Sequence, residues 1–411
     1  MSALFIPRLL VPKTMSGLKG KVAVVAAGHS RWGIRNATWR ELAQEAGREL
    51  FKALPNLDRK DVDSLFVGAA EPERFAFQSH VAPLVADMLG IKPSRVVQRT
   101  ELACASGQSA VRSAAMAVAT GLSEVALCIG IEKMNLPNMA EAQTSMACVL
   151  DREFDGPAGA SAPPFFALTA QRHMHEYGTT EEQMALVSEK NHQNSTSNPY
   201  AQFQKPVPKS KVLSSRMIAP PLKLFDCSGI TDGAAAVLVT SAERAKEFTD
   251  QAAYILGSGQ SAIGGNLANL ASWTTWEPAV IASRGAYKMA GIEPYDLDFV
   301  ESHDCFSISE IIEYEDLGFC KKGEGGKFIE DGNPYIGAKI PVNPRGGLLG
   351  MGHPLGATGI SQICEVLWQF QSKVPKQRQV AGAELAMTHN LSGAANVHSC
   401  LVWGRSPSVG G

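Results

Sequence analysis

The sequence predicts an α/β protein made of two similar halves, with a further segment inserted into the first. Short apolar stretches alternate with stretches of helical spacing, an order that favours a largely parallel sheet covered by helices. The second part of the chain then repeats the order of the first. Between these parts, the segment from about Met134 to Phe225 interrupts the alternation and is rich in proline.

The first half shows strands and helices in alternation. The expected strands are apolar or rich in β-branched residues and cover residues 22–27, 65–68, 94–101 and 125–130. The expected helices have apolar residues at helical spacing and cover residues 39–54, 81–89 and 105–119. After the inserted segment, residues 226–240 return to a core strand.

The second half repeats two recognisable pieces of the first. Residues 279–290 predict a helix closed by Gly291, and the following Asp296–Val300 resembles Asp61–Leu65. A helix over residues 356–370 begins with a sequence similar to Cys104–Ser109. The two repeated pieces lie further apart along the chain in the second half than in the first. The surplus residues are attributed to an insertion, the polar, glycine-rich stretch Lys321–Lys339. Chance similarity of Ala-rich helices is the alternative explanation.

The inserted segment carries one expected helical region and a basic end. Helical spacing runs over residues 166–193. The basic residues could hold the phosphates of an anionic cofactor or could form a solvated charged face; they are Lys205, Lys209, Lys211, Arg216 and Lys223. We therefore expect a leader over 1–21, an N-terminal half over 22–133 and 226–257, an inserted loop domain over 134–225, and a C-terminal half over 258–411.

Composition excludes several classes of function. A net charge of −2 leaves no electrostatic footprint for nucleic acid, and no apolar run is long enough to span a bilayer. The eight cysteines form no CxxC pair, which fits a reducing compartment and predicts neither a disulfide framework nor a metal site. Residues 1–40 contain no acidic residue, which favours a mitochondrial leader over 1–21, with cytoplasmic and peroxisomal locations as alternatives.

The candidate nucleophile is Cys104, at the turn between an expected strand and an Ala-rich helix. The free N–H groups of a helix N-terminus favour a thiolate over a thiol. The alternative is a buried cysteine that only packs. Two more loops carry polar residues next to expected elements. His303–Phe306 follows the strand expected to end at Val300, and Gly352–Pro354 precedes the helix expected over 356–370. A histidine close to a cysteine can activate its thiol, and a second cysteine can exchange protons with a carbon acid.

Other candidate residues carry weaker signals. His173 and His175 lie two positions apart, so on a helix they face different directions and cannot share a metal ion. His389 could line a pocket or make a structural hydrogen bond. The stretch Gly323–Lys327 lacks the spacing of a phosphate-binding loop.

These motifs make the chain recognisable. It resembles the thiolase superfamily, in particular the sterol-carrier-protein-x type, over nearly everything from Lys21 to Val402. The motifs that carry the resemblance, in chain order, are Cys104-Ala105-Ser106, Gly130-Ile131-Glu132-Lys133-Met134, Asp232-Gly233-Ala234-Ala235-Ala236, His303-Asp304-Cys305-Phe306 and Gly352-His353-Pro354. The resemblance implies a thiolase fold of two βαβαβαββ halves that form a five-layer αβαβα core, and a homodimer.

The resemblance also implies a reaction and roles for its residues. Acyl-CoA and coenzyme A would be substrates, with no permanently bound cofactor and no metal. Cys104 would attack the 3-keto carbon of a β-ketoacyl-CoA and release acetyl-CoA, and a second CoA would collect the acyl group. His353 would deprotonate Cys104 and help polarise the thioester oxygen, and His303 would hold a water in that oxyanion hole or donate a hydrogen bond directly. Backbone N–H groups of Cys104 and Gly393 would form the other oxyanion hole.

One departure from the common thiolase pattern decides a further assignment. The C-terminal stretch Thr388–Ala394 has no cysteine where most thiolases carry Cys-x-Gly, so the resemblance assigns the acid/base role to Cys305. Cys400 is interpreted as packing. The altered stretch also motivates an alternative, a thiolase-like protein that binds CoA or lipid with weak or no catalysis. A malonyl-dependent condensing enzyme is disfavoured, because such sites usually lack a second cysteine.

Overall fold

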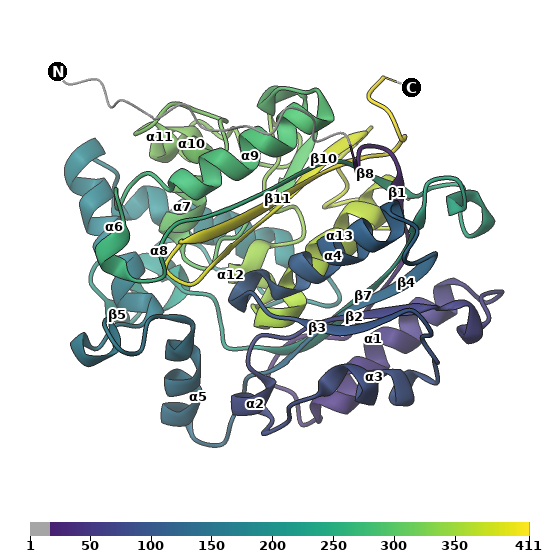
Figure 1. Cartoon of the computed structure of the whole chain (residues 1–411). Helices are drawn as coiled ribbons and strands as arrows, with labels where there is room; N and C mark the ends of the chain where they lie inside the picture. Colours follow the sequence, from purple (N-terminus) through teal and green to yellow (C-terminus); the bar gives the residue numbers. More distant parts are fainter. Residues whose placement is uncertain (1–16, 411) are drawn as a thin grey trace.

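The computed structural model describes residues 17–410, which fold around one nine-stranded sheet (Figure 1). The strands lie in the order β3 (Val96–Thr100), β2 (Ser64–Gly68), β4 (Val125–Lys133), β7 (Asp232–Ser241), β1 (Val22–His29), β8 (Ala253–Ala262), β11 (Val397–Gly404), β10 (Leu385–Ser392) and β9 (Phe299–Glu301). The two halves meet where β1 pairs with β8 over only two residue pairs. Each half therefore keeps a sheet of its own, joined edge to edge with the other.

Helices cover both halves of the sheet and fill the space between them. The outer face of the first half is covered by α1 (Trp39–Ala53) and α3 (Val81–Leu89), and that of the second half by α9 (Glu277–Ala290) and α10 (Ser307–Asp316). The central layer is α4 (Ser106–Ala119) with α13 (Leu355–Phe370), visible between the two parts of the sheet in Figure 1. The five-layer αβαβα prediction is confirmed.

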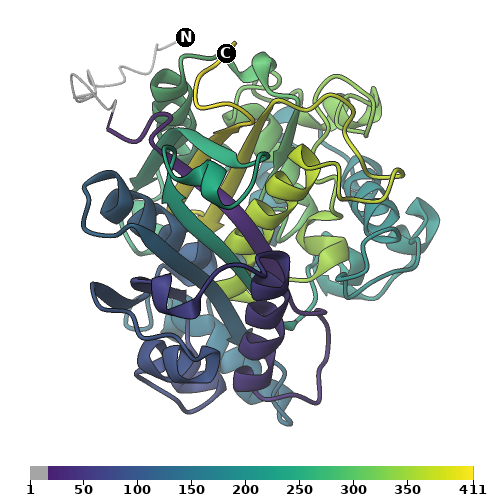
Figure 2. The same ribbon diagram turned by 90° about the vertical axis from the view of Figure 1, so that its right-hand side faces the viewer.

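Strand periodicity explains why the layers form. In β7, Val237 and Val239 pack toward the central helices, while Ala236 and Leu238 pack toward α1 and α3. Successive side chains of a strand point to opposite faces, so a strand buried on both faces must be apolar throughout. Figure 2 shows β1, in purple, running diagonally across the molecule, with the yellow-green helix α13 beside it.

Two equivalent aspartates support the internal repeat. The carboxylate of Asp63 accepts the backbone N–H groups of Glu124 and Val125 at the start of β4. The carboxylate of Asp298 accepts those of Glu384 and Leu385 at the start of β10. In both halves the aspartate just before one strand thus fixes the beginning of its neighbour.

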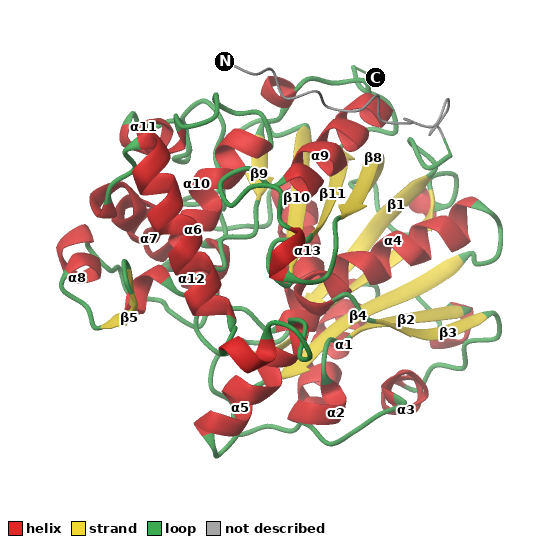
Figure 3. Cartoon of the chain, turned by 60° about the vertical axis from the view of Figure 1, so that its left-hand side comes forward, coloured by secondary structure: helices red, strands yellow, loops and turns green. Residues whose placement is uncertain are grey.

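The inserted segment is mainly helical and lies beside the second half (Figure 3). Its elements are α5 (Met139–Met146), α6 (Ala162–Tyr177), α7 (Glu181–Ser195), α8 (Lys209–Leu213), β5 (Met217–Ala219) and β6 (Leu222–Lys223). The prediction of one helical region over 166–193 is wrong, because two helices occupy it. Gly178, at φ +75°, ends α6, and the Thr180 side chain begins α7 through a capping box with Gln183.

Five short helices were not predicted, namely α5 and α8 of the inserted segment, α2 (Pro72–Phe75), α11 (Gly325–Glu330) and α12 (Gly347–Met351). The glycine-rich stretch expected to hold the surplus residues of the second half contains α11. Pro354 is the N-cap residue of α13.

The predicted leader lies largely outside the described residues. Of residues 1–21, positions 17–21 are described, and two of them attach to the second half. Lys19 Nζ donates a hydrogen bond to the Ala290 carbonyl at 2.7 Å, and the Gly20 N–H donates to the Ile255 carbonyl at 2.8 Å. Across residues 17–410, none of the helices combines the length and the apolar character needed to cross a bilayer.

Candidate active site

Three of the predicted residues come together between the two halves. The Cys104 Sγ atom and one ring nitrogen each from His303 and His353 all lie within 4.8 Å of one another. The two imidazole rings are perpendicular, with centroids 4.9 Å apart. Each residue comes from a different segment of the chain, so the fold assembles this group.

Cys104 lies in a tight turn between β3 and α4. The turn, Ala103–Ala105, is a single 3₁₀ turn in which Ala103 has φ +43°. Hydrogen bonds hold it in place: the Leu102 N–H donates to Ser106 Oγ at 2.8 Å, and the Ala103 N–H donates to a Glu101 carboxylate oxygen at 2.6 Å. Such a left-handed residue costs on the order of 1–3 kcal/mol, a strain that sets the direction of the Cys104 side chain.

The expected thiolate is not the resting state of Cys104. Burial raises the pKa of its thiol to about 12, and nearby Glu71 and Glu132 raise this pKa further, while the N–H groups of Gly393 and of Cys104 itself lower it. Desolvation therefore outweighs the favourable field of the helix N-terminus. The thiol is neutral at rest and needs a base to remove its proton.

His353 supplies a base with a defined tautomer. Its Nδ1 lies 2.7 Å from Thr358 Oγ1, whose own hydroxyl donates to the Pro354 carbonyl at 3.0 Å. Thr358 Oγ1 must therefore accept the proton on Nδ1, which leaves the lone pair on Nε2. That atom is buried and has no hydrogen-bond partner within residues 17–410. Burial first, and then the charge of Arg345, lower the pKa of His353 to about 3, so the ring is neutral.

His303 and Gly393 supply hydrogen-bond donors. Both ring nitrogens of His303 are buried without a partner in the described part of the chain, and burial lowers its pKa well below the usual value. Gly393, at φ +61°, begins the turn between β10 and β11 and directs its N–H at the Cys104 sulfur. Two backbone donors, those of Cys104 and Gly393, thus converge on the reacting atom.

Cys305 is buried next to the same group. Its Sγ lies 3.7 Å from Ser309 Oγ. Burial raises the pKa of the Cys305 thiol well above its usual value, and a charge on nearby Cys104 raises it further. A neutral second thiol can therefore donate a proton close to Cys104.

Asp304 joins the two loops that carry the histidines, a role that sequence reasoning missed. Its carboxylate accepts the N–H of Leu348 at 2.6 Å, the N–H of Leu349 at 3.2 Å and the side-chain amide of Asn191 at 2.6 Å. These N–H groups form the first turn of α12, which ends just before Gly352 and His353. The only available signal was an acidic residue between His303 and Cys305.

Arg345 is a second residue that the sequence did not single out. It is 1% exposed; its Nε donates to Glu301 at 2.6 Å and its Nη1 donates to Ser361 at 2.7 Å. A buried charge is costly unless it is paired and hydrogen-bonded, as Arg345 is here. That charge is the second cause, after burial, that keeps His353 neutral.

Several other candidates lie elsewhere. Four of the five basic residues of the inserted segment are exposed. Lys223 is buried in an ion pair with Glu181, which already neutralises the charge that a phosphate would need. His389 makes a structural hydrogen bond to His398 at 2.9 Å. Cys400 is fully buried in the core, as interpreted. His173 is buried and bonded to Thr179 and Glu315.

Comparisons with known proteins agree with this fold. Residues 22–243 match the family model "Thiolase, N-terminal domain", and residues 259–405 match "Thiolase C-terminal domain-like". The chain is 42% identical to an acetyl-CoA acetyltransferase of Methanothermobacter thermautotrophicus over 93% of this chain and 99% of that protein. It is 32% identical to bovine (Bos taurus) sterol carrier protein 2 over 92% of this chain and 71% of that protein.

Among solved structures, the chain is similar to the "Ltp2-ChsH2(DUF35) aldolase", at 27% identity and a TM-score of 0.81, over 94% of this chain and 98% of that chain. The protein belongs to the thiolase family and is an enzyme of that class. The resemblance found in its sequence motifs is confirmed.

Proposed function

We propose that this thiolase cleaves a 3-ketoacyl-CoA with coenzyme A to acetyl-CoA and a shortened acyl-CoA, or runs the reverse Claisen condensation, through an acyl-enzyme on Cys104. The observation that carries the proposal is the neutral Cys104 thiol beside the unpartnered Nε2 of His353. The 42% identity to an acetyl-CoA acetyltransferase supports acetoacetyl-CoA as the first substrate to test.

The geometry supports the following steps for thiolytic cleavage. His353 Nε2 takes the proton of Cys104 as Sγ attacks the 3-keto carbon, and the N–H groups of Cys104 and Gly393 hold the resulting oxyanion. The C2–C3 bond then breaks, the enolate oxygen of the leaving acetyl-CoA is held by His303 and His353, and Cys305 protonates its carbon. In the second half-reaction the Cys305 thiolate takes the proton of an incoming CoA thiol, and the CoA sulfur attacks the acyl group. Cys104 then leaves as a thiolate and takes back the proton held on His353 Nε2.

One experiment tests the proposal. The protein is incubated with acetoacetyl-CoA and CoA, loss of the enolate absorbance is followed, and the Cys104 peptide is examined by mass spectrometry. We expect turnover and an acyl adduct on Cys104, both lost in Cys104→Ala, with no effect of EDTA. Full activity of Cys104→Ala would refute the nucleophile.

The same experiment separates the alternative functions. A stable adduct without turnover would identify a thiolase-like protein impaired in its second half-reaction. Neither adduct nor turnover would favour a CoA- or lipid-binding protein. Carbon–carbon cleavage without added CoA and without an adduct would favour an aldol-type reaction, the activity for which the 27% identical aldolase is named.

We propose that the four exposed basic residues of the inserted segment hold the phosphates of coenzyme A; they are Lys205, Lys209, Lys211 and Arg216. No ion pair joins any of them to a carboxylate in the described part of the chain. Reversal of two of these charges should raise the KM for CoA and leave kcat nearly unchanged. An unchanged KM would assign them to a solvated surface.

We also propose a homodimer formed through β3. This strand is the last in the sheet order, so one of its backbone edges has no neighbouring strand in residues 17–410. Val97 on this strand is 43% exposed, and Met116 on the adjacent α4 is 41% exposed. An apolar open edge is a template for pairing with a second copy. Light scattering should show twice the chain mass of 43.8 kDa, and Val97→Lys should shift the protein toward a monomer.

A further inference from the structure

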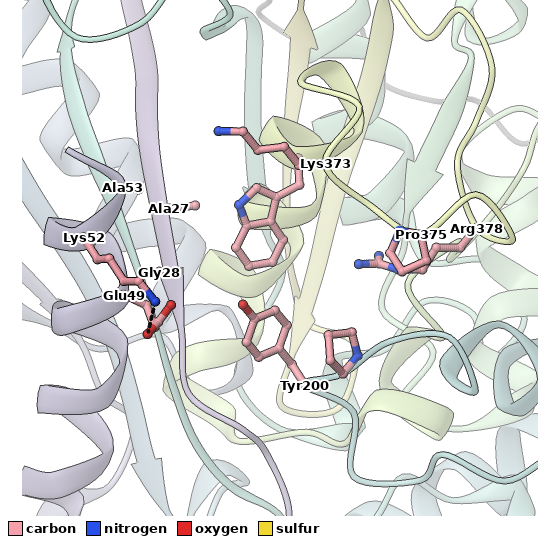
Figure 4. Close-up of a pocket in the computed structure, with 11 residues that line it drawn as sticks. Ala27, Gly28, Glu49, Lys52, Ala53, Tyr200, Lys373, Pro375 and Arg378 are labelled. Atoms are coloured by element: carbon pink, nitrogen blue, oxygen red, sulfur yellow. Dashed lines mark ion pairs between the residues drawn. The ribbon is translucent and has the colours of Figure 1, made fainter. Parts of the chain in front are cut away.

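A cavity of about 390 Å³ lies between α1, β1 and the end of α13, and it shares no lining residue with the Cys104 group (Figure 4). Its floor includes Ala27 and Gly28 of β1, and its walls include residues of the inserted segment and of the loop after α13. A cavity of this size is within the range that encloses small ligands.

One wall is aromatic and rigid. The rings of Tyr200 and Trp368 lie nearly parallel, with centroids 5.4 Å apart and planes inclined by 18°. Behind them, the His29 ring lies 4.7 Å from the Tyr200 ring and is held by a 2.7 Å hydrogen bond between its Nε2 and Ser361 Oγ. Burial lowers the pKa of His29 to about 3, so this support is uncharged. Ring faces fixed in this way suit stacking by a planar ligand.

The other walls bring cations to the aromatic pair. In Figure 4, Tyr200 lies between Lys52 on one side and Arg378 on the other, with Lys373 above. Arg378 is only 2% exposed; its Nη1 pairs with Glu365, but its Nε is buried without a partner within the described residues. Lys373 forms no ion pair in that part of the chain, whereas Lys52 lies 4.0 Å from the Glu49 carboxylate. A buried unpartnered donor costs free energy unless a ligand accepts from it.

We propose that this cavity binds a mononucleotide, with the base against the Tyr200–Trp368 wall and the phosphate near Lys373 and Arg378. Aromatic rings bind any base through its flat face. Arg and Lys side chains are the usual partners of phosphate. The adenine end of a CoA molecule presents the same chemistry, so the test must separate the two sources.

The test is calorimetric titration of the full-length Cys104→Ala protein with AMP, with coenzyme A, and with adenosine as the phosphate-free probe. We expect saturable AMP binding, weaker binding of adenosine, and about tenfold weaker AMP binding in Lys373→Glu. Lys376→Glu changes an exposed lysine of the same loop that does not line the cavity, and it should bind AMP like the parent. Trp368→Leu should also weaken AMP binding.

Two outcomes would overturn the proposal. The first is the absence of saturable AMP binding, or AMP binding that neither Lys373→Glu nor Trp368→Leu changes. The second is binding of coenzyme A, but not of AMP, that depends on Lys373, which would assign the cavity to the coenzyme. Because the titration uses a protein without the nucleophile, its result does not depend on the proposed reaction.

Discussion

Substitution of Thr358 by valine should reduce catalysis by removing the group that orients His353. In the structure, Thr358 Oγ1 accepts the Nδ1 proton of His353 at 2.7 Å and donates its own proton to the Pro354 carbonyl. Valine has nearly the same shape but no hydroxyl. The buried Nδ1–H then has no acceptor, and the imidazolium that forms when Cys104 loses its proton is no longer stabilised.

The size of the effect follows from the charge on that hydrogen bond. A hydrogen bond to a charged group contributes about 1.5–3 kcal/mol. The positive charge exists on His353 only after proton transfer, so most of this stabilisation is lost in the transition state and not in the resting enzyme. The corresponding decrease in kcat/KM is about 10- to 150-fold. The KM for acetoacetyl-CoA should change little, because Thr358 is buried.

The assay is steady-state thiolysis of acetoacetyl-CoA, combined with the rate of acyl-adduct formation on Cys104. Thr358→Ser is the matched control, since it keeps the hydroxyl and should retain most of the activity. Thermal unfolding of both variants shows whether the loss of the bond to Pro354 affects the fold. A Thr358→Val enzyme that forms the adduct within twofold of the wild-type rate would refute the assigned tautomer.

Three further predictions concern neighbouring residues. Cys305→Ala should slow turnover by about 10²- to 10⁴-fold while Cys104 still accepts an acyl group, measured by burst kinetics; equal losses in both steps would contradict a role confined to proton transfer. Asp304→Asn should lower kcat by about tenfold, because an amide cannot accept from all three donors; a lower melting temperature with normal kcat would assign Asp304 to stability alone. Burial, and then the charge of Glu132, raise the pKa of Glu71 to about 8. Glu71 therefore keeps its proton in the folded state over pH values at which the unfolded chain has lost it, and its contribution to the free energy of unfolding should fall from about pH 4.5 to pH 8. In Glu71→Gln this decrease should be absent, and iodoacetamide should label Cys104 faster than in the wild type above pH 8; equal labelling at pH 9 would show that the Glu71 charge does not reach the thiol.

Local pattern was sufficient for most secondary structure. A continuous apolar run identified β1, and an Ala-rich stretch after Cys104 identified α4, because burial on both faces and helix propensity act within a few residues. One helical region was predicted over 166–193, although Gly178 followed by a Thr-x-x-Gln capping box signals the division into α6 and α7. Helix α12 could not be predicted from local pattern, because it contains two glycines and its first turn is held by Asp304 from a distant loop.

The residues of the candidate site were also only partly predictable from the sequence. The sequence predicted Cys104, His303, Cys305 and His353 as site residues, because each stands in a short motif that resembles one of the thiolase family. The structure brings Cys104, His303 and His353 together. The sequence could not identify Thr358, since nothing in the motif tells which hydroxyl reaches the imidazole. Nor could it show that Lys223 of β6 is buried in an ion pair with Glu181, because the partner lies on α7, 42 residues away in the chain.

Motifs and periodicity thus determine which residues can react and which elements bury them, since both depend on neighbours along the chain. Protonation states and hydrogen-bond partners were decided only by the tertiary structure. The helix N-terminus favours a Cys104 thiolate, yet desolvation of the sulfur in the folded chain raises its pKa to about 12. Solvation and charge act through space, so their balance exists only once distant segments have come together.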